Sequence, residues 1–158
     1  MSNDSYIRHQ LVNLLTQPQA HMTFDDAIEN FPMAHINTRP ENVEYTFWHL
    51  VEHLRICQWD ILDYCRNPDY QELNFPDDLW RPRHEMTDEA GWNQSIAQFR
   101  AGLAEWVAMV QNPKTDLYAP IPHGYDGHTI FREILVVADH NAYHIGEFGV
   151  LRHIVGGW

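Results

Sequence analysis

The chain has 158 residues, of which 44% are hydrophobic, and it carries 22 Asp and Glu against 10 Lys and Arg. This apolar content excludes an intrinsically disordered chain, and the length fits a single globular domain over residues 1–158. The formal net charge of −12 repels phosphate backbones and anionic lipids. Nucleic acids and membrane surfaces are therefore not expected partners.

The sequence predicts neither a secretion signal nor a membrane span, which indicates a cytoplasmic protein. The N-terminal segment MSNDSYIRHQ is polar, and no uninterrupted run of about 18 apolar residues follows it. Cys57 and Cys65 fall on one predicted helix, where their separation corresponds to about 12 Å of axial rise. Disulfide-bonded Cα atoms lie within about 7 Å of each other, so we expect two free thiols.

Helical periodicity covers most of the chain, and no alternating run is long enough to require a sheet. Thr23 and Thr129 are the predicted N-caps of the second and the last helix. Long Pro-rich or Gly-rich connections separate the last three helices. The pattern predicts an all-α fold, a four-helix bundle with long crossover connections and one short extra helix. The predicted helices span residues 6–16, 24–30, 43–66, 87–112 and 129–155.

Two His-x-x-x-His pairs, His49/His53 and His140/His144, are the main candidates for chemistry. Residues four apart share one face of a helix, so each pair could hold a metal ion. At about 100° per residue, His140 and His144 both point toward the apolar stripe of the last helix. His53 lies at the edge of the stripe of its own helix, whereas His49 lies further round. We therefore expect His53 to face inward and His49 to be solvated or to support the ligands from outside.

Several neighbouring residues have open roles. Four carboxylates share a face with these histidines or adjoin them in sequence, and each could orient an imidazole, bind the metal or only solvate its helix. They are Glu52, Glu133, Asp139 and Glu147. His123 and His128 flank a Gly-rich turn and either line the mouth of a pocket or belong to a solvated loop.

The cysteines and most tryptophans are assigned to packing. Both cysteines fall on an apolar stripe without a basic neighbour, which argues against a nucleophilic thiol. The tryptophans at helical spacing or at helix edges favour a role in the core or in an interface. These are Trp48, Trp59, Trp80, Trp92 and Trp106.

Two long strings resemble the DinB superfamily of small bacterial four-helix bundles. They are YTFWHLVEHLRICQWDIL and FREILVVADHNAYHIGEFGVLRHIVGGW, and ADHNAYHIGE is the most specific part. The likeness extends over about residues 40–158. Such proteins usually bind a metal through one histidine of the second bundle helix and two of the last. The resemblance thus implies His53, His140 and His144 as metal ligands, in agreement with the directions in which these residues face.

The resemblance also implies a class of reaction. Some members of the superfamily resemble transferases that use a low-molecular-weight thiol. Three neutral imidazoles leave a divalent ion its full charge, which favours a bound thiolate for S-transfer or an activated water for hydrolysis. We expect a thiol-dependent transferase acting on a small-molecule thiol or electrophile. A metal-dependent hydrolase and a non-catalytic, metal-binding or stress-linked protein are the alternatives.

Three further features remain open or are expected on general grounds. The ion could be Ni, Zn, Mn or Fe, and no residue is singled out as catalytic. No organic cofactor is expected, because the sequence has no Gly-rich phosphate loop. The six tryptophans favour a homodimer that buries an aromatic face.

Overall fold

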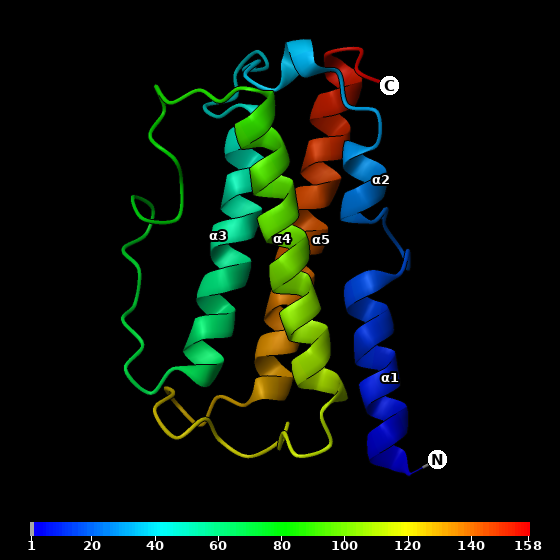
Figure 1. Cartoon of the computed structure of the whole chain (residues 1–158), viewed down its shortest axis with the longest axis vertical. Coiled ribbons are helices and arrows are strands. Elements are labelled where there is room, and N and C mark those ends of the chain that lie inside the picture. The colour runs from blue at the N-terminus through cyan, green and yellow to red at the C-terminus, as the bar shows by residue number, and fades with distance from the viewer. Residues whose placement is uncertain (1) are drawn as a thin grey trace.

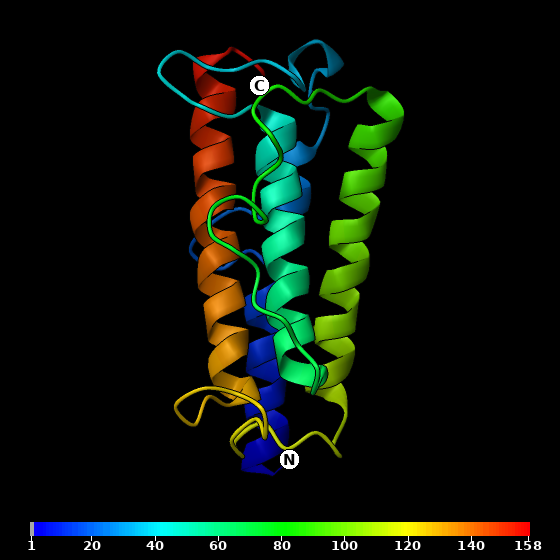
Figure 2. The ribbon, with the colours of Figure 1, turned by 90° about the vertical axis from the view of Figure 1, so that its left-hand side faces the viewer.

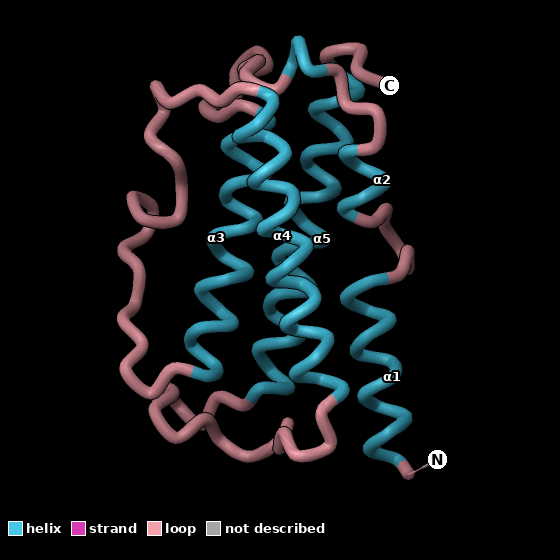
Figure 3. The backbone as a smooth tube through the Cα atoms, viewed as in Figure 1, coloured by secondary structure: helices cyan, strands magenta, loops and turns pink. Residues whose placement is uncertain are grey.

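The computed structural model describes residues 2–158, and this part of the chain is helical without a strand (Figures 1 and 3). An isolated bridge pairs Pro120 with Thr129. The predicted all-α fold is thereby confirmed. The helices are α1 (Asn3–Thr16), α2 (Phe24–Ile28), α3 (Phe47–Arg66), α4 (Glu89–Gln111) and α5 (Ile130–Ile154), with a short 3₁₀ turn at Met33–His35.

Side-chain caps determine where the helices begin. Thr23 and Thr129 cap α2 and α5 as predicted, each accepting a hydrogen bond from the backbone N–H three residues later. Thr46 does the same for α3, which therefore begins four residues later than the apolar pattern predicts. Ser2 caps α1, which begins three residues earlier than predicted. Hydrophobic periodicity does not register these caps, because they depend on a polar side chain next to the helix.

Four long helices lie side by side, and each has two neighbours. α3 contacts α4 and α5, and α1 contacts the same two helices, so α1 and α3 occupy opposite corners. The short α2 continues the column of α1 and packs against α5 (Figure 1). No helix of the described residues is long and apolar enough to cross a membrane.

The connection between α3 and α4 returns along the length of the molecule. Residues 67–88 run from the end of α3 to the start of α4, so these two neighbouring helices point the same way (Figure 1). In Figure 2 this segment passes in front of α3, close to α5. This crossover segment, residues 67–88, was predicted only as a surface connection, yet it reaches the histidines described below.

The buried apolar residues form two clusters with a polar layer between them. On α5, members of the lower cluster end at Val137 and members of the upper cluster resume at Ile145. In the layer between them, the Gln58 side chain donates to the Phe99 carbonyl and accepts from Asn141. Each member of this pair makes at least one hydrogen bond, which offsets part of the cost of burying it, whereas Oδ1 of Asn141 has no partner among the described residues. The predicted metal ligands fall at this height of α3 and α5.

The tryptophans divide between the core and the surface. Trp48, Trp92 and Trp106 are buried, as predicted. Trp59 is 46% exposed, so it does not belong to the core of this chain. The other predicted place for it, an interface, stays a prediction. Both cysteines are buried and free, as predicted.

Candidate metal centre

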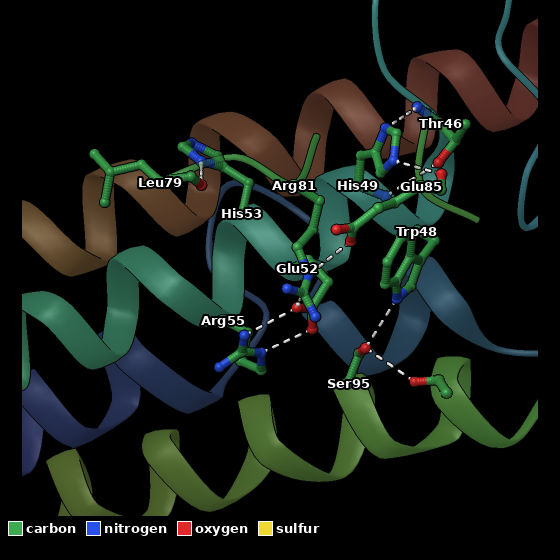
Figure 4. Close-up of polar contacts among 11 residues, drawn as sticks. Thr46, Trp48, His49, Glu52, His53, Arg55, Leu79, Arg81, Glu85 and Ser95 are labelled. Carbon is green, nitrogen blue, oxygen red and sulfur yellow. Dashed lines mark hydrogen bonds and ion pairs between the residues drawn. The ribbon is translucent and has the colours of Figure 1, made fainter. Parts of the chain in front are cut away.

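The crossover segment contacts the His53 ring both at its Nδ1 edge and on its face. Its Nδ1 lies 2.9 Å from the Leu79 carbonyl oxygen (Figure 4), which can only accept, so Nδ1 carries the proton. The indole of Trp80 stacks on the His53 ring with centroids 3.8 Å apart and planes 8° from parallel. These two contacts fix the tautomer and the plane of the ring. The Nε2 lone pair consequently faces α5.

His144 is oriented by a carboxylate one turn later on α5. Its Nδ1 lies 2.7 Å from Oε2 of Glu147, and the hydroxyl of Tyr45 donates to the other carboxylate oxygen. Burial alone would raise the pKa of Glu147, but hydrogen bonds from His144 and Tyr45 outweigh it and lower that pKa. The carboxylate therefore accepts the Nδ1 proton, and Nε2 of His144 points at the other histidines.

Between α3 and α5, the Nε2 atom of His53 faces the Nε2 atoms of both other predicted ligands. It lies 3.1 Å from Nε2 of His144 and 3.2 Å from Nε2 of His140. Two nitrogens that each bind one ion at about 2.1 Å lie roughly 3.0–3.4 Å apart. Both separations from His53 thus match those of ligands to a shared metal ion. We call His53, His140 and His144 the histidine cluster.

Burial lowers the pKa of two imidazoles of this cluster. Burial lowers the pKa of His53 to about 4, with further lowering by the other two imidazoles. Burial, reinforced by His144, likewise lowers the pKa of His140 to about 4. Nδ1 is engaged by the Leu79 carbonyl in His53 and by the Glu147 carboxylate in His144, so the Nε2 atoms of the two rings face each other at 3.1 Å. A divalent ion can accept a lone pair from each of two such nitrogens, so the donor set fits a metal.

His140 differs from its two partners in its second nitrogen. Its buried Nδ1 has no hydrogen-bond partner among the described residues. The usual histidine ligand donates this second N–H to a carboxylate, a carbonyl or a water. The ring of His140 is therefore held mainly by packing, with its centroid 4.7 Å from that of His144.

Cys57 adds a sulfur to the same neighbourhood. Its Sγ lies 3.5 Å from Nδ1 and 3.8 Å from Nε2 of His53, one turn earlier on α3. Donor atoms of His53, Cys57 and His140 lie within 4.8 Å of one another. Burial, aided by Asp60, raises the pKa of the Cys57 thiol to about 12. Its predicted burial is confirmed, but its place beside the histidine cluster was not predicted.

Glu52 supports the crossover segment rather than a histidine. It is 2% exposed, and its two oxygens pair with Arg55 and, at 3.0 Å, with Arg81 (Figure 4). Arg81 follows directly after Leu79 and Trp80, which contact His53. The ion pair therefore attaches the crossover segment to α3 next to the ring that it orients.

His49 is buried at 1% exposure and hydrogen-bonds none of the three histidines of the cluster, so it is neither solvated nor a direct support of the ligands, the two roles predicted for it. Its Nδ1 accepts from the backbone N–H of Thr46 at the start of α3, and its Nε2 lies 3.0 Å from the Glu85 carbonyl. The side chain was expected to face solvent because the crossover segment that covers it cannot be placed from periodicity. It does not join the histidine cluster.

The remaining candidates lie away from the cluster. Asp139 is exposed. Glu133 is buried two turns before His140 and pairs with Arg132 at 2.6 Å. His123 and His128 are partly buried and contact Tyr64 near the end of α3, away from the histidine cluster. His128 lines a different hollow, which is described below.

The contacts that sequence reasoning missed come from connecting segments. Leu79 and Trp80 lie in a stretch without helical periodicity, and Tyr45 lies just before α3. The only sequence signal was the aromatic character of Trp80 and Tyr45, which stack at a centroid distance of 4.9 Å. Nothing in that signal specifies which helix they cover.

Comparison with known proteins gives one match. The model of a family described as the DinB superfamily matches residues 18–148. The chain matches no curated protein and no solved structure. The matched region includes α3, the crossover segment, α4 and the three histidines of the cluster.

Proposed function

Because the chain belongs to the DinB superfamily, we propose that it is a thiol-dependent transferase whose divalent metal is held by His53, His140 and His144. The main support for a metal ion is that Nε2 of His53 lies 3.1 Å from Nε2 of His144 and 3.2 Å from Nε2 of His140. Within this proposal the helices form one four-helix bundle domain over residues 1–158, with the crossover segment as its long connection.

Each ligand would depend on a different support. The Leu79 carbonyl and the Trp80 indole hold His53 in plane, and Glu147 keeps the proton of His144 on Nδ1. Imidazole ligands suit Zn, Fe and Ni, whereas Mn prefers oxygen ligands, so Mn fits this donor set least well of the four expected ions. A divalent ion at this site would lower the pKa of a bound thiol or water and so supply a nucleophile near neutral pH.

The family likeness favours a thiol over water as the nucleophile. In this reaction the sulfur of a small-molecule thiol would attack an electrophilic carbon and release its leaving group. Both oxygens of Glu147 already accept hydrogen bonds, which argues against its closing the metal site as a fourth ligand. An open position is what a catalytic site requires, and hydrolysis by an activated water is the second possibility for the same position.

Cys57 supports a different candidate function, a non-catalytic metal protein. If its sulfur became a ligand with the histidines, the site would be closed by the chain itself, as structural zinc sites are. The ion would then serve only to hold α3 and α5 together. The choice between the two functions therefore depends on whether Cys57 or an added thiol binds the metal.

Cobalt substitution distinguishes these functions. Co²⁺ bound by thiolate has an intense near-ultraviolet charge-transfer band that Co²⁺ bound only by imidazole and water lacks. We expect the Co²⁺ protein to lack this band until a small thiol is added, and turnover with a panel of thiols and electrophiles to require the metal. Full metal occupancy without turnover on any thiol, electrophile, ester or amide would refute the enzyme proposal.

Cys57→Ser is the informative variant, and Cys65→Ser is its matched control, since both thiols are buried on α3. A band that is present without added thiol, disappears in Cys57→Ser and persists in Cys65→Ser would establish the non-catalytic site. A band that appears only with added thiol in all three proteins would support the transferase.

We also propose that the protein is a cytoplasmic homodimer. Three apolar side chains on one side of α5, Tyr143, Val150 and Ile154, are each more than 60% exposed. A second copy would cover them, because symmetric dimers are the commonest soluble oligomers. Light scattering should give twice the mass of the chain, and Val150→Glu should reduce it to one. A monomeric mass of the unmodified protein at micromolar concentration would refute the dimer.

A further inference from the structure

A hollow lies along the same two helices as the histidine cluster. Asp60 follows His53 by seven residues on α3, and Glu133 precedes His140 by seven on α5, so each lies two turns, or about 10 Å, away on a similar face. The hollow is open to solvent and measures about 160 Å³. It is lined by Asp60, Ile61, Tyr64, Tyr70, Tyr125, His128, Arg132 and Glu133.

Three tyrosine rings form much of its wall, and we call Tyr64, Tyr70 and Tyr125 the tyrosine cluster. The ring of Tyr64 is buried, with the Tyr70 ring edge-on at 5.2 Å and the Tyr125 ring stacked at 5.5 Å. The Tyr64 hydroxyl accepts from the backbone N–H of Tyr125 at 2.8 Å, which fixes the loop before α5 against the end of α3. The rings come from three different segments and are held together by specific contacts.

The charge at this hollow is mainly negative. Asp60 accepts a hydrogen bond from the Tyr70 hydroxyl at 2.9 Å and has no cationic partner among the described residues. Burial raises the pKa of Asp60, and the carboxylates of Asp63 and Glu72 raise it further. Burial, Glu72 and Asp60 likewise raise the pKa of Tyr125. A cation in the hollow would relieve this accumulation of negative charge.

Arg132 is the cation nearest to this wall, and it is already paired. Its guanidinium lies 2.6 Å from Glu133, whose carboxylate is 5% exposed. His128 lies 3.1 Å from the Tyr64 hydroxyl and 3.4 Å from Glu133. The ion pair with Glu133 engages Arg132, whereas Asp60 has no cationic partner among the described residues, which disfavours an anionic ligand.

We propose that the tyrosine cluster and Asp60 form a binding site for a small organic ammonium ion. Aromatic faces attract such cations through their quadrupoles, and a carboxylate supplies the opposite charge. The volume admits a ligand of several heavy atoms, for which affinities near the millimolar range are expected. The site is independent of the metal, since none of its residues belongs to the histidine cluster.

Choline and its uncharged carbon isostere 3,3-dimethylbutanol test this proposal by isothermal titration calorimetry. The two have nearly the same shape, so a difference in affinity reports the positive charge. We expect choline to bind metal-free protein at least about tenfold more tightly than the isostere, and acetate not to bind. Equal affinity for choline and its isostere, or binding of acetate alone, would overturn the proposal.

Two variants locate the site. Asp60→Asn should weaken choline binding by at least about threefold, and Tyr125→Ala, on the exposed loop, should weaken it to a similar extent. Asp77→Asn and Tyr118→Ala are the matched controls, because both residues are exposed and lie outside the hollow. Choline affinity that is unchanged in both site variants, with the fold retained by circular dichroism, would also overturn the proposal. The choline affinity of His53→Ala should equal that of the unmodified protein, because this variant alters only the proposed metal site.

Discussion

Asp60 lies two turns after His53 on α3, yet the surroundings of these two residues favour opposite kinds of ligand. Around His53 and His140, burial lowers the pKa of each imidazole and leaves neutral nitrogen donors. Around Asp60, burial acts on a carboxylate without a cationic partner, and the neighbouring groups are aromatic rings and further acids.

The same pair of helices thus presents neutral nitrogen donors at one height and carboxylates at another. The connecting segment that covers each height contributes the groups that surround them. The crossover segment supplies Leu79 and Trp80 at the histidines. The loop before α5 supplies Tyr125 and His128 at the tyrosines. Helix packing positions both sites, and the loops determine the chemistry of each.

Loss of a histidine ligand should have the largest effect. His53→Ala and His144→Ala should each lose most of the bound metal, because each removes a nitrogen from the shared point. His153→Ala, an exposed histidine on α5, should keep it. Metal analysis after dialysis measures the outcome. Full metal content in His53→Ala would contradict the proposal that His53 is a metal ligand.

Removing the carboxylate behind His144 should have the next largest effect. Glu147→Gln should weaken metal affinity about 10–100-fold, since outer partners of histidine ligands contribute by that amount. Competition with a chelating dye measures the affinity. Asp60→Asn, which alters only the other cluster, should leave it unchanged. An equal loss in both variants would indicate a general electrostatic effect rather than an orienting one.

Acid should destabilise the metal-free protein through the histidine cluster. The folded-state pKa of His53 and of His140 is about 4, below the value near 6.5 of an unfolded histidine. The unfolded chain therefore binds more protons, and stability present above pH 6.5 is lost as the pH falls toward 4. The loss should reach at most roughly 3 kcal/mol per histidine.

Urea unfolding between pH 7 and pH 4 measures this dependence. In His140→Ala the slope of unfolding free energy against pH should be smaller, whereas in His153→Ala it should match that of the unmodified protein. An identical slope in His140→Ala would assign the acid sensitivity to carboxylates elsewhere.

Release of the crossover segment should have the smallest effect. Arg81 is 42% exposed in its side chain, so Arg81→Ala should lower the free energy of unfolding by only about 0.5–1 kcal/mol. Hydrogen exchange of the amides around Trp80 should nevertheless become faster, because the ion pair to Glu52 holds this segment on α3. Arg83→Ala, which removes an exposed ion pair with Glu44, should not change that exchange. Unchanged exchange in Arg81→Ala would show that Trp80 stacking alone holds the segment.

Local sequence signals determined most of the helical framework. Apolar residues at helical spacing located the four long helices, and the Thr23 cap located the short α2. Thr129 marked the start of α5, since capping requires only a few neighbouring residues. The directions of His53, His140 and His144 around their helices could also be predicted, because a fixed rotation per residue relates a side chain to the apolar stripe. Their distances across α3 and α5 could not be predicted in this way.

The tertiary structure alone decided what surrounds those histidines. Leu79 lies 26 residues after His53, in a stretch without periodicity, so no local pattern relates its carbonyl to that ring. The burial of His49 and the position of Cys57 likewise depend on how the crossover segment and α5 cover α3. Side-chain periodicity records one helix at a time, whereas tautomers, pKa shifts and the convergence of donor atoms arise only where segments distant in sequence meet.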